Sequence, residues 1–174
     1  EVVDCIVFWT KNPANMLGKL EYLQDYAYYF QFTLTGYGRD MEPNLPEKRK
    51  ELIPAFQKLS EKIGKEKVIW RYDPILLSDK YTADYHLKAF EEIAGNLAGY
   101  TEKAVISFVD LYEKTWRNTR GLGIRLATEK EMMGLAAEMA QIASKYNLEI
   151  ESCAEQRDFQ KVGLQQGSCI DKQL

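Results

Sequence analysis

The sequence predicts an α/β domain built from repeated strand–helix units. Short runs rich in β-branched and aromatic residues alternate, about five times, with longer segments whose apolar residues recur at helical spacing. The strand-like runs are almost continuously apolar, which is typical of parallel strands buried on both faces. Right-handed crossovers then leave two architectures, a partial TIM-like (β/α) barrel or an open doubly wound sheet. We favour the barrel, because no glycine-rich dinucleotide-binding turn follows the first strand.

Five segments read as strands, each ended by polar residues or glycine. They are residues 3–9, 28–35, 68–72, 104–109 and 148–153. Residues after the fifth strand predict a short helix or an irregular tail. No linker or low-complexity run divides the order, so we expect residues 1–174 to form a single domain.

Four segments between the strands read as helices. The first begins at Asn12-Pro13, an N-cap followed by a proline at the first helical position, and carries an apolar stripe from Met16 to Leu23. The second covers residues 52–63, with Pro54 predicting a kink or a break and Gly64 a C-terminal cap. The third covers residues 85–97, and the fourth follows a capping box formed by Thr128 and Glu131.

Composition narrows the class of protein. The 45% hydrophobic content indicates a packed globular protein. The net charge of −3 argues against general electrostatic binding to nucleic acid or anionic lipid. No apolar stretch approaches the roughly 20 residues that a membrane span needs. Three widely separated cysteines fit reduced thiols in a cytoplasm, and no closely spaced cysteine pair is present to hold a metal. Because the chain begins at Glu1 almost inside a strand, we expect a fragment of a longer protein.

The carboxyl ends of parallel strands lie on one edge of a sheet, so a binding site is expected there. We assign substrate or cofactor binding to Thr10, Lys11, Asn12, Thr35, Gly36, Arg71 and Ser107, and catalysis to Asp73, Asp110 and Glu155. Thr33 and Glu151 end strands in the same way. Each of these residues alone also fits a solvated strand end, and the helix cap is a sufficient explanation for Asn12.

Arg71 and Asp73 carry the most information, because they interrupt a strand. Residues two positions apart share one face of a strand, so the two side chains are expected to pair. A structural salt bridge and a functional role both fit such a pair. Lys11 and Arg71 suit a phosphate or a carboxylate, while the acids could bind hydroxyls, chelate a metal or transfer a proton.

Two other features of the sequence bear on function. His86, the one histidine of the chain, is expected to face solvent on the third helix, which gives little support to histidine-based zinc sites or catalytic triads. A basic loop with an aromatic ring reads as a surface loop, with phosphate binding or base stacking as the alternative. It comprises Lys114, Trp116, Arg117, Asn118 and Arg120.

Several segments resemble an uncharacterised bacterial family known as a domain of unknown function. They are FWTKNP (residues 8–13), YYFQFTLTGYG (28–38), EPNLP (42–46), VIWRYDPIL (68–76), YTEKAVISFVDLY (100–112) and CAE (153–155). Members of that family are longer at both ends and carry a C-terminal cysteine cluster similar to the iron–sulfur motif of radical S-adenosylmethionine enzymes. A fainter resemblance to the spore photoproduct lyase group rests on Thr10-Lys11 and Asp73-Pro74.

The resemblance implies a partial barrel of the radical S-adenosylmethionine type, acting on a small-molecule substrate that the sequence does not specify. A 4Fe–4S cluster and S-adenosylmethionine are expected for the full-length protein. The chain ends at Leu174 before any cysteine cluster, so by itself it is expected to hold no cofactor and to be inactive. Two alternatives stand beside this interpretation: a cluster-independent, metal-assisted hydrolase or lyase using the three acids, and a nucleic-acid-binding or repair module.

Overall fold

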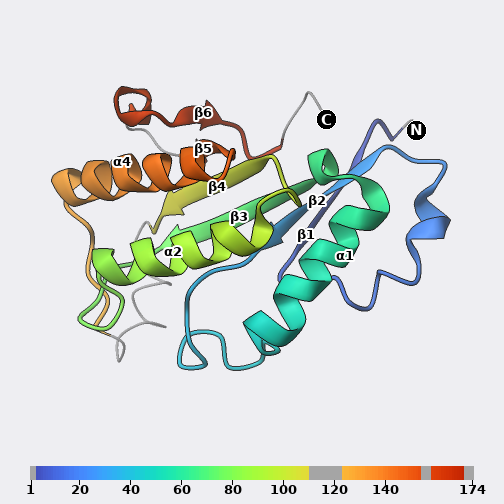
Figure 1. The fold of residues 1–174 in the computed structure, drawn as a ribbon, viewed down its shortest axis with the longest axis horizontal. Coiled ribbons are helices and arrows are strands. Elements are labelled where there is room, and N and C mark those ends of the chain that lie inside the picture. The colour runs from blue at the N-terminus through green and yellow to red at the C-terminus, as the bar shows by residue number, and fades with distance from the viewer. Residues whose placement is uncertain (1–2, 110–122, 154–157, 171–174) are drawn as a thin grey trace.

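The computed structural model describes residues 3–109, 123–153 and 158–170, and these form one parallel six-stranded sheet. Each strand pairs with the next one along the chain, so the spatial order is β1-β2-β3-β4-β5-β6 (Figure 1). The strands are β1 (Ile6–Thr10), β2 (Tyr28–Thr33), β3 (Val68–Ile75), β4 (Lys103–Phe108), β5 (Glu149–Cys153) and β6 (Gln165–Gly167). This confirms the prediction of parallel strand–helix repeats.

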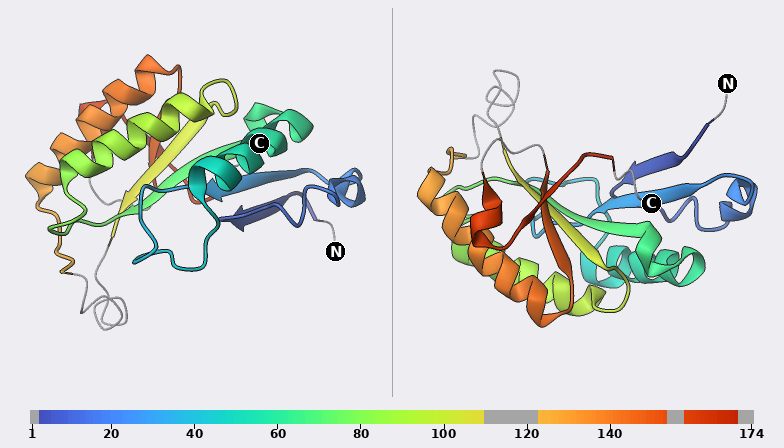
Figure 2. Two further views of the ribbon diagram at one scale, coloured as in Figure 1. Left: turned by 60° about the horizontal axis from the view of Figure 1, so that its bottom comes forward. Right: turned by 90° about the horizontal axis from the view of Figure 1, so that it is seen from above.

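The α-helices of the described chain all cover one face of the sheet (Figures 1 and 2). They are α1 (Ile53–Ile63), α2 (Ala83–Leu97) and α4 (Glu129–Lys145). A doubly wound sheet reverses its strand order and carries helices on both faces, and neither feature is present in the described residues. The sheet winds in one direction, as in a barrel, but it stays open: β1 and β6 do not pair with each other. We call the face away from these helices the back face.

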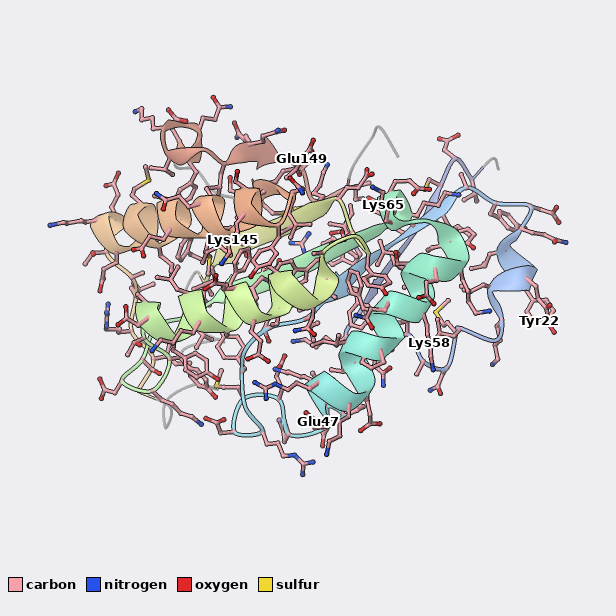
Figure 3. All side chains as sticks on the ribbon, in the orientation of Figure 1. Tyr22, Glu47, Lys58, Lys65, Lys145 and Glu149 are labelled. Carbon is pink, nitrogen blue, oxygen red and sulfur yellow. The ribbon has the colours of Figure 1, made fainter. Side chains whose placement is uncertain are left out.

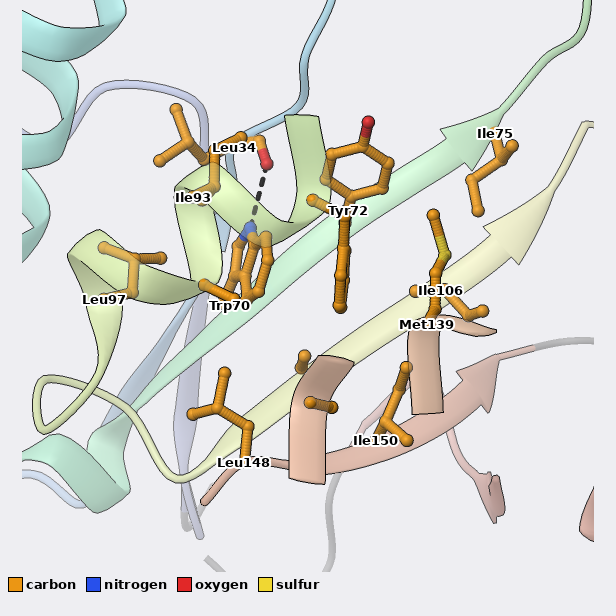
Figure 4. Packing of buried hydrophobic residues seen from close by; sticks show 14 of the residues in the cluster. Leu34, Trp70, Tyr72, Ile75, Ile93, Leu97, Ile106, Met139, Leu148 and Ile150 are labelled. Atoms are coloured by element: carbon orange, nitrogen blue, oxygen red, sulfur yellow. Dashed lines mark hydrogen bonds between the residues drawn. The ribbon is translucent and has the colours of Figure 1, made fainter. Parts of the chain in front are cut away.

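The main hydrophobic core lies between the sheet and the helices. Trp70 of β3 is fully buried there (Figure 4). It stacks on Phe90 of α2, with ring centroids 4.7 Å apart. A smaller apolar cluster occupies the back face, formed by Tyr29, Ile69, Val105 and Cys153. Strand residues therefore alternate between two buried environments, which explains their nearly continuous apolar sequence.

The expected first helix is replaced by turns and a short 3-10 helix, Leu20–Leu23. The carbonyl of Pro13 accepts from the N–H groups of Met16 and Leu17, at 2.8 and 3.2 Å, so a single helical turn does begin where it was predicted. Gly18 follows directly, and glycine costs about 1 kcal/mol relative to alanine inside a helix. Met16, Leu17 and Leu20 of the apolar stripe still pack against the core, but without a continuous helix.

The other helix signals were confirmed. A π-helical turn, Lys48–Leu52, precedes α1, and Pro54 lies in the first turn of α1, so it marks a break between two helical pieces. Glu47, labelled in Figure 3, accepts from the backbone N–H groups of Arg49 and Lys50 and caps the entry. Gly64 ends α1 at φ 97°, and the capping box of Thr128 and Glu131 begins α4.

The C-terminal part differs from its prediction by one strand. A 3-10 helix, Phe159–Val162, matches the expected short helix, but β6 then adds to the edge of the sheet. Its sequence, QQG, has neither β-branched nor aromatic residues, so its strand conformation depends on pairing with β5. None of the helices in the described ranges could span a lipid bilayer.

The prediction that His86 faces solvent is wrong. Its ring is fully buried: Nε2 donates to the carbonyl of Leu76 at 2.9 Å, and Nδ1 accepts from the hydroxyl of Tyr72 at 3.0 Å. Both ring nitrogens are therefore used by the neutral form. Burial lowers the pKa of His86, against a smaller opposing effect of the Leu76 hydrogen bond. Helical spacing alone could not reveal this, because the partners come from β3 and the segment that follows it.

We expect the stability of the protein to fall as the pH is lowered from 7.5 to 5.5. Unfolded histidine takes up a proton near pH 6.5, whereas folded His86 does so only at lower pH; the unfolded state then binds more protons and is favoured. Urea unfolding at several pH values measures this slope. Because the chain has one histidine, the His86→Gln variant should show a flatter slope over this range. Equal slopes for the two proteins would contradict the assignment.

Candidate functional site

Arg71 lies at the centre of the back face, towards the carboxyl edge of the sheet. The strand register aligns it with Thr33 on β2 and Val105 on β4. Its side chain is almost completely buried, with 6% of its surface exposed. Arginine is rarely buried to this extent unless its charge is paired.

The guanidinium of Arg71 is held from three sides. Nε and Nη2 both donate to Oδ2 of Asp73, the former at 2.9 Å, and Nη1 donates to Oε1 of Gln31 at 2.5 Å. The indole ring of Trp9 lies against the guanidinium, with its centroid 4.9 Å from Cζ. Burial alone would lower the pKa of Arg71, but the hydrogen bonds and negative charge of Asp73 outweigh it and raise the pKa. We name this group the Arg71 cluster: Trp9, Gln31, Arg71 and Asp73.

The Arg71 cluster confirms that Arg71 and Asp73 share a face and form an ion pair. Sequence reasoning missed Trp9, which it assigned to a buried strand, and Gln31. Trp9 is 57% exposed because β1 is an edge strand, and it is the most accessible member of the cluster. The sequence did contain one signal for Trp9, because it directly precedes the predicted site residues Thr10 and Lys11.

A second cluster joins the ends of β1 and β2 to the entry of α1. The carboxylate of Glu42 accepts from Nζ of Lys11 and Nζ of Lys48, each at 2.5 Å, and from the hydroxyl of Thr35 at 3.1 Å. Lys48 also donates to the carbonyl of Tyr37. We name Lys11, Thr35, Glu42 and Lys48 the Glu42 cluster.

Two cations around one carboxylate leave the Glu42 cluster with a net positive charge. Burial would raise the pKa of Glu42, but the two lysines hold it below its usual value. Burial lowers the pKa of Lys48, although Glu42 opposes this. The side chain of Lys11 is 45% exposed, compared with 8% for Glu42. Lys11 is therefore the cation in this cluster that an incoming anion can reach most easily.

Of the Glu42 cluster, Lys11 and Thr35 were predicted, whereas Glu42 and Lys48 were missed. Both missed residues lie in the polar loop and the helix entry after β2, far from any strand end in sequence. The segment EPNLP, which begins at Glu42, was among the motifs that carried the family resemblance.

Other predicted site residues have local structural roles. The hydroxyl of Thr10 accepts from the N–H of Asn12, and Asn12 Oδ1 accepts from the N–H of Ala14, both at 3.0 Å, so Asn12 caps the turn as expected. A Cβ atom at Gly36 would lie 2.5 Å from Cβ of Ala89, so this glycine allows close packing against α2.

The remaining predicted residues divide into two groups. Ser107 lies near the end of β4 with Val105 on the back face, and Glu151 of β5 pairs with Lys103 at 2.7 Å. Asp110, Glu155 and the basic loop from Lys114 to Arg120 lie outside the described residues. The candidate catalytic acids are therefore represented here by Asp73.

A resident metal site is not apparent within the described part of the chain. No three histidine, cysteine or acidic side chains there are grouped closely enough to hold a metal ion. Cys153 and Cys169 do meet, with their sulfur atoms 3.2 Å apart, but a 4Fe–4S cluster requires more thiolates than this pair provides. The described thiols thus do not fit such a cluster.

Comparison with protein families identifies the chain by sequence. The model of a family described as "Domain of unknown function (DUF1848)" matches residues 1–174. The chain belongs to the DUF1848 family. This agrees with the resemblance to a domain of unknown function that the motifs indicated, and the DUF1848 description assigns no activity. No curated protein sequence matches this DUF1848 chain.

Proposed function

We propose that this DUF1848 chain provides the ligand-binding sheet of a radical S-adenosylmethionine-like enzyme, with the iron–sulfur cluster carried by a segment outside residues 1–174. The observation that carries the proposal is the position of charged side chains at one edge of a parallel sheet. A singly wound parallel sheet brings the Arg71 cluster and the Glu42 cluster to its carboxyl edge, where α/β proteins bind their ligands. The choice of cofactor rests on the resemblance stated in the sequence analysis.

In this proposal, residues of the two clusters bind different groups of S-adenosylmethionine. Lys11 is a half-exposed cation suited to its carboxylate, and the exposed ring of Trp9 offers a stacking surface for its adenine. Asp73, Asp110 and Glu155 are carboxylates suited to its ammonium group or to ribose hydroxyls. Because the described cysteines do not fit a cluster, the proposal assigns binding and orientation to this chain and not electron transfer. It also assigns the protein to a reducing cytoplasm and to a small-molecule substrate.

Equilibrium dialysis of the purified protein against S-adenosylmethionine tests the binding step. We expect saturable binding that weakens about ten-fold in Lys11→Gln, which corresponds to a loss of roughly 1.4 kcal/mol of binding free energy. Trp9→Leu should also weaken it. Lys58→Gln changes an exposed lysine of α1 (Figure 3) that belongs to neither cluster, and it should leave binding unchanged.

Four results would contradict the proposal, each in a different way. Equal affinity for wild-type and Lys11→Gln proteins would remove the Glu42 cluster from the site. Saturable binding of a divalent ion, lost in Asp73→Asn, without binding of S-adenosylmethionine would favour the metal-assisted hydrolase or lyase. A full-length member that stays colourless and iron-free after anaerobic reconstitution would exclude the radical chemistry. Salt-sensitive binding to oligonucleotides would instead favour the nucleic-acid module.

A further inference from the structure

Two cysteines that are 16 positions apart meet at the carboxyl edge of the sheet. Cys153 is the last residue of β5, and Cys169 follows β6; their sulfur atoms are 3.2 Å apart. The parallel pairing of β5 with β6 brings them together, since it aligns Cys153 with Gly167. The two thiols differ in access, because Cys153 is buried and Cys169 is exposed.

The segment that carries Cys169 reaches across the back face. The side-chain amide of Gln31, on β2, donates to the carbonyl of Cys169 at 2.7 Å. In the sheet, β3, β4 and β5 lie between β2 and β6, so residues 168–170 bridge towards the opposite side of the sheet. We name residues 168–170 the strap.

The strap is hydrogen-bonded to one of the polar groups that are buried on the back face. Gln31 is 2% exposed and Arg71 is 5% exposed, although the described α-helices all lie on the other face. The side-chain amide of Gln31 donates through Nε2 to the strap and accepts through Oε1 from Arg71. The strap is therefore linked to the Arg71 cluster through the side-chain amide of Gln31.

We propose that Cys153 and Cys169 are a reversible dithiol–disulfide pair that fastens the strap across the back face. The site is built for an internal bond, because the two sulfur atoms are already in contact and belong to segments held by strand pairing and by the Gln31 hydrogen bond. Formation of this disulfide needs no S-adenosylmethionine, so the pair can be tested without that ligand.

The chemistry needs a small-molecule disulfide, such as oxidised glutathione, as the oxidant. The exposed Cys169 thiolate attacks one sulfur of that disulfide, forms a mixed disulfide and releases one small thiolate. The Cys153 thiolate then attacks Sγ of Cys169; the mixed disulfide bond breaks and the second small thiolate leaves. Overall the two cysteines lose two electrons and two protons, the electrons reduce the oxidant, and the protons pass to solvent or to the released thiolates.

The surroundings of Cys153 fit the second of these steps. Burial raises the pKa of its thiol, while the neighbouring Arg71 acts in the opposite direction and favours the thiolate. An inaccessible thiol of this kind reacts poorly with an external oxidant but can resolve a mixed disulfide formed beside it. The order of attack, Cys169 first and Cys153 second, follows from exposure and does not depend on the pKa alone.

Oxidation of the native protein with oxidised glutathione, followed by intact-mass measurement and peptide mapping, tests the pair. We expect the wild-type chain to lose the mass of two hydrogen atoms, to yield a peptide linking Cys153 to Cys169, and to recover fully in dithiothreitol. Cys5 packs against the same apolar cluster as Cys153, so Cys5→Ser is the matched control and should behave as wild type. Cys153→Ser should instead stop at a stable glutathione adduct on Cys169.

A second readout tests the fastening of the strap. Hydrogen exchange of the β6 backbone should slow about ten-fold or more on oxidation of wild type and of Cys5→Ser, and should not change in Cys169→Ser. A peptide linking Cys5 to Cys153, or persistent glutathione adducts on both Cys153 and Cys169, would overturn the pairing. A correct bridge without slower exchange of β6 would overturn the role assigned to the strap.

Discussion

Replacing Arg71 with methionine is expected to lower the free energy of unfolding by about 3–5 kcal/mol, the cost of breaking a buried ion pair from one side. The side chains of Arg71 and Asp73 are only 6% and 13% exposed, so water can replace the lost contacts only in part. Methionine keeps much of the aliphatic volume but leaves the Asp73 carboxylate and Oε1 of Gln31 without their donors. Urea unfolding followed by circular dichroism measures the loss.

Two comparisons separate the loss of the buried ion pair from other effects of the Arg71→Met substitution. Arg49→Met removes an ion pair with Glu92 whose partners are 73% and 43% exposed, and should cost no more than about 1 kcal/mol. Adding Asp73→Asn to Arg71→Met should recover part of the loss, because an amide is cheaper to bury than an unpaired carboxylate. If Arg71→Met costs no more than Arg49→Met, the Arg71 cluster is not a structural centre of the back face.

Trp70→Ala is expected to cost about 3–5 kcal/mol of unfolding free energy, as for other fully buried aromatic residues. Trp70 stacks on Phe90, and its indole N–H donates to the carbonyl of Leu34 at 2.8 Å (Figure 4). That hydrogen bond fixes the chain just before Thr35, so the same change should also disturb the Glu42 cluster. Trp70→Phe keeps a ring but leaves the Leu34 carbonyl unpaired, at a cost of about 1–3 kcal/mol.

Trp9→Ala is the matched control for the Trp70 series, because it removes the same side chain from an exposed position. We expect it to cost about 1 kcal/mol or less, chiefly through its contact with the Arg71 guanidinium. Unfolding is followed by circular dichroism and not by tryptophan fluorescence, because each substitution removes a tryptophan. Similar losses for Trp9→Ala and Trp70→Ala would contradict the positions assigned to the two rings.

Local patterns in the sequence were enough to predict most of the fold. Strand positions follow from apolar runs, the break at Pro54 from its missing N–H, and the start of α4 from the Thr128–Glu131 capping box. The pairing of Arg71 with Asp73 was also predictable, because both lie on one strand and its period of two fixes their faces. Each of these inferences depends on residues that are close in sequence.

The predictions that failed, or were not made, depend on contacts between distant segments. His86 is buried by hydrogen bonds to Tyr72 and Leu76, and Glu42 acquires its role from Lys11, which lies 31 positions earlier. The strand conformation of β6 requires β5 as a template. Periodicity in the sequence also does not tell whether helices cover one face of a sheet or both. The choice between a singly and a doubly wound sheet therefore required the strand order and the helix positions of the structure.

The open sheet has a consequence for assembly. Within the described residues β1 pairs through one side with β2 and β6 through one side with β5, so the sheet has two free margins rather than a closed ring. Backbone groups along such margins can template a further strand, by β-augmentation, without disturbing the packed interior. The described sheet can thus be lengthened from either side, and each strand added in parallel would extend the carboxyl edge on which the charged clusters lie.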